Sequence, residues 1–340
     1  MTKLYPLHYV VLCMQLLCTF AHATVVPAFS LNQLVNDSDV IVVGEISDMH
    51  EIGNTTVLVS GALVRARKMA GVVDVQEVLK GAVRTSRLDI QFAITEKWVG
   101  YPSIPSGTRI LFLNLAGETS VPANLYYPSL PAVAGTKSTG GTVLDRVVSE
   151  LVAVLGSASA PVDQKSETIA RLEGIATPSV LSALKNAATQ NNDTVRLNAV
   201  TALLERDEIS VLPIAERALL NPDRQLPDYL RHNLSYGIFT GVKSERAIPA
   251  LSRLLASPET EVRRAAIMAL RRSGSHQALN PLTKGLYDSD LQVRYLSVLG
   301  LAEITGETNW ETSQEEFSAD ELRYLRYWRQ WATDSQTRHR

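Results

Sequence analysis

The second half of the chain repeats one spacing of apolar and small residues. A long or branched aliphatic residue is followed four, seven and eight positions later by small or aliphatic residues, which is the spacing of one face of an α-helix. The residue directly after the first aliphatic residue is arginine in every copy. The copies start 35, 32 and 31 residues apart, which predicts stacked helical units with a period in the low thirties. The four copies are Val195-Ala199-Ala202-Leu203, Leu230-Leu234-Gly237-Ile238, Val262-Ala266-Ala269-Leu270 and Val293-Ser297-Gly300-Leu301.

Each unit also contains a second helix that begins with proline. Proline is tolerated in the first helical turn because the amides there have no intrahelical acceptor. We therefore expect four helix pairs and a final helix, which together form an all-α solenoid over residues 143–305. Arrays of this kind provide binding surfaces far more often than active sites. The prolines are Pro178, Pro213, Pro249 and Pro281.

The first half of the chain shows short β-forming runs separated by turns. Five runs without a long helix between them predict a small antiparallel β-barrel or sandwich over residues 24–115, preceded by a short helix that Ser30 caps. Residues 116–142 are rich in Gly, Pro, Ser and Thr and are expected to be a linker. The fold class predicted is therefore α+β with two domains. The runs are Val40–Gly44, Val57–Val64, Val72–Leu79, Leu88–Ile94 and Ile110–Leu115.

Two segments of the helical half resemble HEAT repeats. Ser257–Leu270 (SPETEVRRAAIMAL) and Asp288–Arg294 (DSDLQVR) are similar to the short type of repeat that is also called phycobilin-lyase-like. The resemblance covers residues 160–305. It implies an armadillo-like, right-handed superhelix with a concave face that is used for proteins or extended ligands.

The N-terminal half resembles another module. The order of Leu34–Ile46, Val75–Gly81 and Gly107–Leu113 is similar to N-terminal domains of exported bacterial proteins, and through them to the OB-type barrel of netrin and tissue-inhibitor-of-metalloprotease modules. In the inhibitor family a mature N-terminal cysteine chelates the metal of the protease. Here the expected mature chain starts at Thr24, so that mechanism is not carried over.

The recurring arginine has two interpretations. A ladder of cations could grip an anion, but an acidic residue lies one helical turn earlier in three of the units, at Asp193, Glu259 and Asp290. Pairs at this spacing, or bridges between neighbouring units, are common in stacked helices. The structural interpretation is therefore preferred.

The C-terminal segment, residues 306–340, breaks the repeat. Ser318 and Glu321 have the spacing of a capping box, which predicts a helix through Trp331 that covers the open end of the solenoid. The alternative is that Tyr324, Tyr327 and Trp331 face outward as anchors for a partner.

The N-terminus has the pattern of a cleaved signal peptide. Lys3 is followed by an apolar run from Val10 to Phe20 and by an A-x-A site that ends at Ala23. We therefore expect residues 1–23 to be removed and the mature protein to be secreted or periplasmic, without an integral membrane span. An uncleaved anchor is the alternative. Both cysteines lie in this leader, so no thiol chemistry is expected of the mature chain.

Charge and motifs exclude several classes of function. The formal net charge is −2, which gives no support to nucleic-acid binding. Hydrolase, kinase, nucleotide-binding and zinc-protease motifs are absent from the sequence, and His50, His232, His276 and His339 are scattered. We therefore expect no metal, no cofactor and no catalytic residue.

The sequence favours a non-enzymatic protein-binding or scaffold role. The second helices are expected to form the inner wall of the solenoid and to contact a protein partner whose identity the sequence does not give. One alternative is an inhibitor or modulator of an extracellular enzyme that acts through the N-terminal barrel. The other is a lyase-like or other enzyme with unrecognised chemistry. The candidate contact residues on the inner wall are Glu216, Arg217, Arg253, Lys284 and Tyr287.

Overall fold

The computed structural model describes residues 29–59, 61–95, 104–221 and 225–338. The chain divides after Leu130 into a unit that contains a β-sheet and a helical unit. The predicted α+β class with two domains is confirmed. The expected signal peptide, both cysteines and His339 lie outside the described residues.

The strands of the first unit pair in a closed ring. Their order is β1-β2-β3-β5-β4, and β4 pairs with β1 to close the ring, while β6 lies beside β4. The recorded pairings are antiparallel except that of β3 with β5. The bounds are β1 Val40–Val59, β2 Ala62–Lys80, β3 Arg87–Thr95, β4 Thr108–Ala116, β5 Thr119–Pro122 and β6 Ser129–Pro131.

The core of this unit is made by the β-branched and aliphatic residues that alternate along the predicted runs. Val42, Val73, Ile90 and Leu111 are fully buried in one cluster. The helix before the ring, α2 (Leu31–Asp37), begins as predicted with a Ser30 capping box.

Two boundaries of the first half differ from the sequence prediction. The run Val57–Val64 is not one strand but the end of a hairpin, in which β-forming residues stand on both arms and Gly61 adopts a φ of 83°. The linker expected over residues 116–142 is wrong for residues 119–131. Residues 119–122 form β5, which pairs with both β3 and β4, and residues 129–131 form β6.

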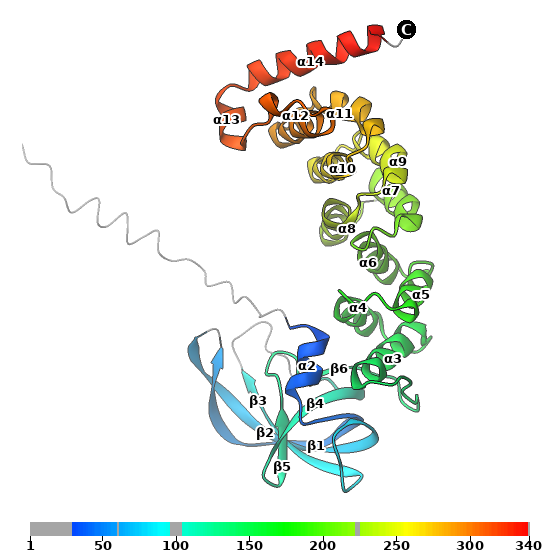
Figure 1. The fold of residues 1–340 in the computed structure, drawn as a ribbon. Coiled ribbons are helices and arrows are strands. Elements are labelled where there is room, and N and C mark those ends of the chain that lie inside the picture. Colours follow the sequence, from blue (N-terminus) through cyan, green and yellow to red (C-terminus); the bar gives the residue numbers. More distant parts are fainter. Residues whose placement is uncertain (1–28, 60, 96–103, 222–224, 339–340) are drawn as a thin grey trace, which may run out of the picture. The chain divides into compact units, whose positions relative to one another are not determined.

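The second unit is a stack of helix pairs that continues to the final helix before the C-terminal segment (Figure 1). Short 3-10 turns precede α7, α9 and α11, which carry the prolines seen in the sequence. The helices are α3 Val143–Gly156, α4 Val162–Arg171, α5 Pro178–Ala187, α6 Asp193–Leu204, α7 Leu212–Leu220, α8 Asp228–Gly241, α9 Ile248–Leu254, α10 Thr260–Arg272, α11 Leu279–Gly285, α12 Leu291–Thr305, α13 Gln314–Ala319 and α14 Glu321–Arg338.

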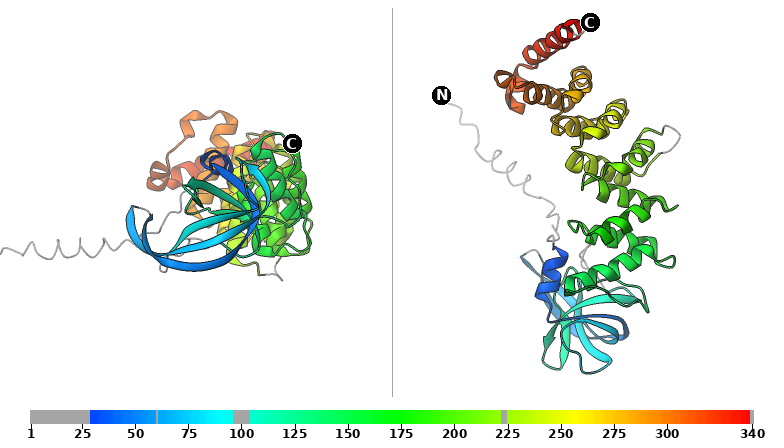
Figure 2. Two further views of the ribbon diagram at one scale, coloured as in Figure 1. Left: turned by 90° about the horizontal axis from the view of Figure 1, so that it is seen from below. Right: turned by 45° about the vertical axis from the view of Figure 1, so that its right-hand side comes forward.

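The two helices of each pair form separate rows. Within this unit α4, α6, α8, α10 and α12 lie on the inner side of the curve, and α5, α7, α9 and α11 lie on the outer side (Figures 1 and 2). The inner row is made by the helices that carry the repeated stripe.

Small residues of the stripe set the distance between inner helices. A Cβ atom on Gly237 would lie 3.0 Å from the carbonyl oxygen of Thr201, and one on Gly241 would lie 2.0 Å from that of Leu204. A Cβ atom on Gly300 of α12 would lie 3.0 Å from the Leu282 side chain of α11 and 3.2 Å from the Arg271 side chain of α10. The backbones of α8 and α6 therefore touch directly, which only a residue without a side chain permits.

The C-terminal segment contains two helices where the sequence predicted one. The capping box belongs to Ser313 and Glu316 at the start of α13, so the expected box of Ser318 and Glu321 is wrong. Ser318 lies inside α13 and donates to the Gln314 carbonyl, and Asp320 separates this helix from α14. The Ser-x-x-Glu spacing of a capping box occurs twice in this segment. Only Ser313 and Glu316 are followed by an unbroken helical turn, because Asp320 interrupts the helix between Ser318 and Glu321.

The close contact at Gly241 generates a stability prediction. In Gly241→Ala the new methyl group meets the backbone of α6, so we expect the free energy of unfolding to fall by about 2–3 kcal/mol. Urea denaturation followed by circular dichroism measures the change. Gly156→Ala is the matched control, because Gly156 also ends a helix but has no atom near its Cβ position. Equal stability of the two variants would contradict the close-packing argument.

Candidate functional site

The charged residues expected on an inner wall lie on the outer row instead. Glu216 and Arg217 belong to α7, Arg253 to α9 and Lys284 to α11, and Tyr287 follows α11. The expectation that the second helices form the inner wall is therefore wrong. The physical reason is that the first helices carry the small residues that allow the closest approach. The row with the shorter spacing between helices becomes the inside of the bend.

These five residues do not form one site. Arg253 Nη2 donates to Glu216 Oε2 at 2.9 Å, and this hydrogen bond lowers the pKa of Glu216 and raises that of Arg253. The Arg329 guanidinium lies 4.4 Å from the centroid of the Tyr287 ring. The other two cations of the set are exposed and stand on different helices. The set is thus divided between contacts within the protein and isolated surface charges.

The aromatic residues of the C-terminal helix pack onto their own chain. Tyr327 stacks on Trp310, with ring centroids 3.7 Å apart and planes at 14°. The ring centroids of Tyr324 and Phe317 are 5.9 Å apart. Trp331 packs edge-on against Trp328, with ring centroids 5.5 Å apart. Burial raises the pKa of the Tyr327 hydroxyl. Tyr324 and Tyr327 thus join an internal cluster, and α14 packs on α11 and α12 at the end of the array.

The recurring arginines link consecutive units, which confirms the structural interpretation over the anion-binding one. Three of them donate to a carboxylate beyond their own unit. Arg196 and Arg231 pair with an acid one turn earlier in their own helices, Asp193 and Asp228. Two also donate to carbonyl groups of the preceding loop. The pairs between units are Arg231 with Glu261, Arg263 with Asp288 and Arg294 with Glu321.

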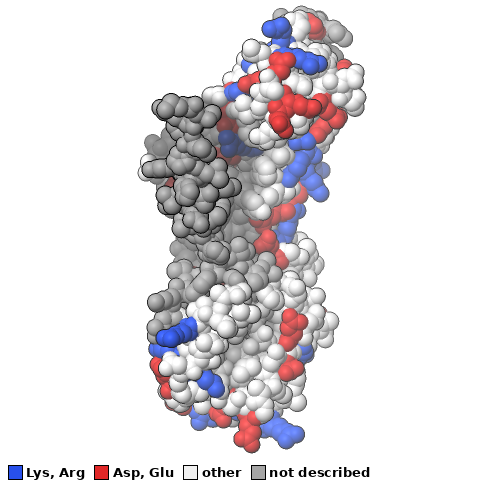
Figure 3. Space-filling view, turned by 90° about the vertical axis from the view of Figure 1, so that its left-hand side faces the viewer, with Lys and Arg blue, Asp and Glu red and all other residues white. Residues whose placement is uncertain are grey.

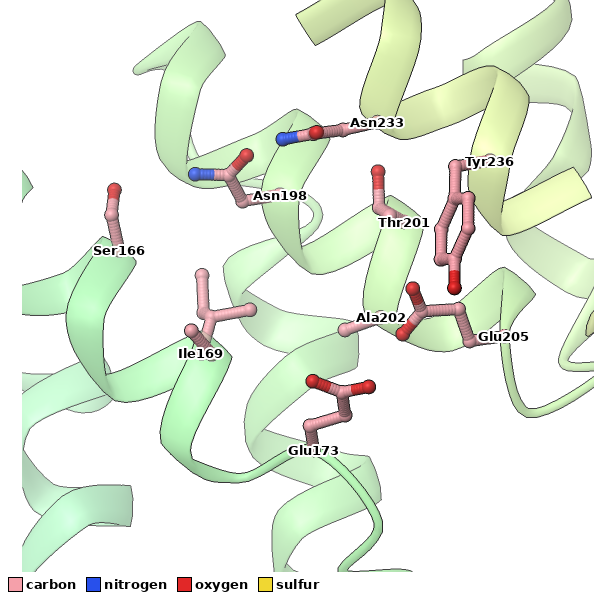
Figure 4. A pocket seen from close by; sticks show the side chains of 10 residues that line it. Ser166, Ile169, Glu173, Asn198, Thr201, Ala202, Glu205, Asn233 and Tyr236 are labelled. Carbon is pink, nitrogen blue, oxygen red and sulfur yellow. The ribbon is translucent and has the colours of Figure 1, made fainter. Parts of the chain in front are cut away.

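An open groove of about 430 Å³ lies on the inner row, where α4, α6 and α8 meet. Asn198 and Asn233 line one end, and Glu173, Glu205 and Tyr236 line the other (Figure 4). Because all three helices belong to the helical unit, the groove is a feature of the repeat array itself.

Two polar atoms in the wall of the groove lack hydrogen-bond partners among the described residues. The Asn198 Oδ1 and Ser166 Oγ atoms are buried and unpaired. A buried acceptor without a partner costs about 1–3 kcal/mol relative to a bonded one. Both atoms belong to residues that line the groove, so its wall contains polar groups that the fold leaves unsatisfied.

At one end of the groove, two carboxylates lie at helix C-termini, where negative charge is destabilising. Glu205 is the C-cap of α6, and Glu173 directly follows the C-cap of α4. Helix C-termini attract cations and repel carboxylates. Burial, and then the charge of Glu173, raises the pKa of Glu205, although the nearby Arg206 acts in the opposite direction. Arg206 Nη2 donates to the Leu172 carbonyl at 2.7 Å, and burial lowers its pKa.

Helix α8 adds exposed aromatic side chains to the inner row. Tyr229 and Tyr236 are both 53% exposed and Phe239 is 38% exposed. Tyr236 lines the groove beside the carboxylates. Tyrosine combines a large contact area with little conformational entropy, which suits a recognition surface.

The sequence contains a signal for this groove that the search for motifs missed. Glu173 and Glu205 lie 32 residues apart, which is one repeat period. Asn198 and Asn233 each stand three positions after the first aliphatic residue of their stripes. Polar residues that recur at one position of a repeat mark a common face, and here that face is the inner row.

Other kinds of site find little support in the described part of the chain. It contains no group of three or more His, Cys, Asp or Glu residues that could hold a metal ion. Among the same residues, no helix combines the length and the apolar character needed to cross a bilayer. On the face shown in Figure 3, cations and carboxylates are interspersed rather than gathered in one extended basic patch.

Comparison with protein families identifies the repeat. The family described as HEAT repeats matches residues 227–302, which comprise α8 to α12 except the last residues of α12. Residues 227–302 of the helical unit therefore contain HEAT repeats, as the sequence predicted. No curated protein sequence matches the chain.

Solved structures with some similarity include the complex of CpcE and CpcF of phycocyanin lyase from Nostoc sp. PCC7120. That match has 19% identity and a TM-score of 0.38, and it covers 53% of this chain and 70% of the other. An engineered protein matches with 17% identity and a TM-score of 0.35 over 54% and 94% of the two chains. Human deoxyhypusine hydroxylase in complex with glycerol matches with 18% identity and a TM-score of 0.25 over 56% and 73%.

The raised pKa of Glu205 generates a prediction about pH. A carboxyl group whose folded pKa exceeds its unfolded pKa destabilises the fold when it is ionised, and this effect disappears as the pH falls through the folded pKa. We therefore expect Glu205→Gln to raise the Tm by a few degrees at pH 7 and to have little effect near pH 4.5. Calorimetry at both pH values measures this.

Glu208 provides a control of opposite sign. Hydrogen bonds, first from Lys185, lower the pKa of Glu208, so its ionised form stabilises the fold above the unfolded pKa. Glu208→Gln is expected to lower the Tm at pH 7. If both variants shift the Tm in the same direction, the assigned electrostatic difference is wrong.

Proposed function

We propose that this protein is an exported, non-enzymatic scaffold whose inner row of HEAT helices binds a segment of a protein partner. The observation that carries the proposal is the groove between α4, α6 and α8, which combines unpaired buried acceptors, two carboxylates and an exposed tyrosine. HEAT arrays present extended surfaces for binding. The groove is open along one side, which suits an extended peptide segment.

The chemistry of the groove favours a basic side chain as the part of the partner that is recognised. Glu173 and Glu205 stand at helix C-termini, where the backbone already presents negative partial charge. A lysine or arginine would reduce the repulsion between the two carboxylates. The Tyr236 ring beside the carboxylates offers a cation–π surface.

A binding role fits these features better than a catalytic one. The groove supplies acceptors and apolar contact, which orient and hold a ligand. Its carboxylates are held at the ends of neighbouring helices, and Arg206, which interacts electrostatically with both, donates to the carbonyls of Ala202 and Leu172. This arrangement supports recognition of charge and offers no nucleophile activated by a base.

The proposed contact can be tested by site-specific photocross-linking. A photoreactive phenylalanine in place of Tyr236 is expected to capture a partner in cells, whereas the same residue in place of Tyr287 on the outer row is not. The captured segment should contain lysine or arginine. Cross-links of equal strength at the two positions would count against the inner row.

Charge neutralisation tests the proposed recognition of a basic side chain. Each of Glu173→Gln and Glu205→Gln should weaken binding of the captured partner by about tenfold or more, because a hydrogen bond to a charged group contributes about 1.5–3 kcal/mol. Titration calorimetry measures the affinity. Glu216→Gln makes the same chemical change on the outer row and should leave the affinity unchanged. An unchanged affinity in all three variants would remove the carboxylates from the proposal.

Export is supported by the leader pattern of the sequence. A positive residue, a short apolar run and an A-x-A site occur in the order that signal peptidases recognise. We expect the mature chain to begin at Thr24. N-terminal sequencing of the protein recovered from the expressing cells measures this, and a chain that retains Lys3 would contradict cleavage.

A further inference from the structure

The hairpin of β1 and β2 extends beyond the rest of the sheet. The pairing of β1 with β4 stops at Glu45, and the pairing of β2 with β3 starts at Ala66. Between these limits the hairpin pairs with itself, down to the final rung of Val59 and Ala62. Its end is thus a two-stranded arm rather than part of the closed ring.

The two faces of this arm differ in exposure. On one face Val59 is 1% and Ala66 4% exposed, so these two residues are buried, whereas Ala62 and Lys68 on that face are exposed. On the other face Leu58 and Leu63 stand directly opposite each other and are 61% and 75% exposed. Two large aliphatic side chains are therefore held side by side in solvent at the end of the arm. The fold gains nothing from this pair that the two buried residues do not already provide.

Cations follow the leucine pair along the arm. Arg65, opposite Thr56, is the next residue of β2 on the face that carries Leu63, whereas Lys68 is exposed on the other face, where β2 already pairs with β3. Arg67 lies between them and approaches Glu51 at 3.7 Å. Residues 53–68 contain three cations and no carboxylate, although the chain as a whole is nearly neutral. The arm therefore combines an apolar tip with a local positive charge.

We propose that this arm docks on the surface of an anionic lipid membrane. Leu58 and Leu63 enter the interfacial layer, and Arg65 on the same face contacts lipid phosphates. Apolar insertion together with attraction to anionic lipid is the usual combination for peripheral binding. Among the described residues, both edges of this two-stranded arm keep unpaired backbone groups, so it enters only the hydrated interfacial layer and not the hydrocarbon core.

The composition of the arm favours lipid over a protein partner. Hot spots of protein interfaces are enriched in Trp, Tyr and Arg, and leucine is under-represented in them. Residues 53–68 contain no aromatic residue. A pair of aliphatic residues with cations behind it matches the layering of a membrane surface, in which the phosphates lie just outside the acyl chains. The proposal is independent of the groove on the helical unit.

Vesicle sedimentation tests the proposal. The protein is used in its expected processed form from Thr24, so that the apolar leader does not contribute. It should pellet with vesicles of phosphatidylcholine that contain 30% phosphatidylserine, and it should pellet much less with phosphatidylcholine alone or at high salt. Failure to bind the anionic vesicles at low salt overturns the proposal.

Variants assign the binding to the arm. Leu58→Ser with Leu63→Ser should lower the partition coefficient at least tenfold, and Arg65→Gln should lower it about fivefold, since one cation near an anionic surface contributes about 1 kcal/mol. Leu115→Ser is the matched control, because Leu115 is 57% exposed on β4 of the same unit. Equal losses in the leucine pair and in this control overturn the assignment to the arm.

A second measurement does not depend on loss of binding. Leu58→Trp places a fluorophore at the tip, and its emission should shift to the blue when anionic vesicles are added. An unshifted emission from bound protein overturns insertion of the tip. Capture of a protein at this position, without any binding to vesicles, would assign the arm to a protein partner and overturn the lipid proposal.

Discussion

The direct backbone contact between inner-row helices is the constraint on which the helical unit depends. Gly241 of α8 lies against the carbonyl group of Leu204, and Gly237 lies against that of Thr201. Such contacts bring the inner helices closer together than the outer ones, and this difference bends the stack toward the inner row. The same bend places the polar positions of α4, α6 and α8 around one groove. Glycine and alanine in the repeat thus determine both packing and the position of the candidate site.

Ion pairs of the recurring arginines link consecutive helical units beside the apolar core. Arg263 and Asp288 are 12% and 10% exposed, and Arg263 also donates to the carbonyls of the loop before its helix. A guanidinium group has enough donors to bind a carboxylate and carbonyls at once, which lysine cannot do in a fixed plane. These arginines use their hydrogen bonds within the array. The residues proposed to recognise a ligand are therefore different ones, which line the groove on the inner row.

The groove of the helical unit and the hairpin arm of the sheet unit each contain side chains in an unfavourable environment. Glu173 and Glu205 are ionisable groups at helix ends that would prefer cations, whereas Leu58 and Leu63 are apolar groups held in water. Neither arrangement stabilises the fold by itself. Both become favourable when something of complementary character binds, which is why each supports a proposal about binding rather than catalysis.

The sequence by itself determined the elements and the repeat. Local spacing predicted the helix pairs, the Ser30 cap, most strands and the HEAT repeat, because apolar periodicity and caps act over a few residues. Only the tertiary structure decided which row faces inward, since the bend depends on contacts such as Gly241 with Leu204, about 37 residues apart. It also assigned residues 119–131 to the ring and divided the C-terminal segment after Ala319, because pairing partners and competing caps are chosen by the rest of the fold.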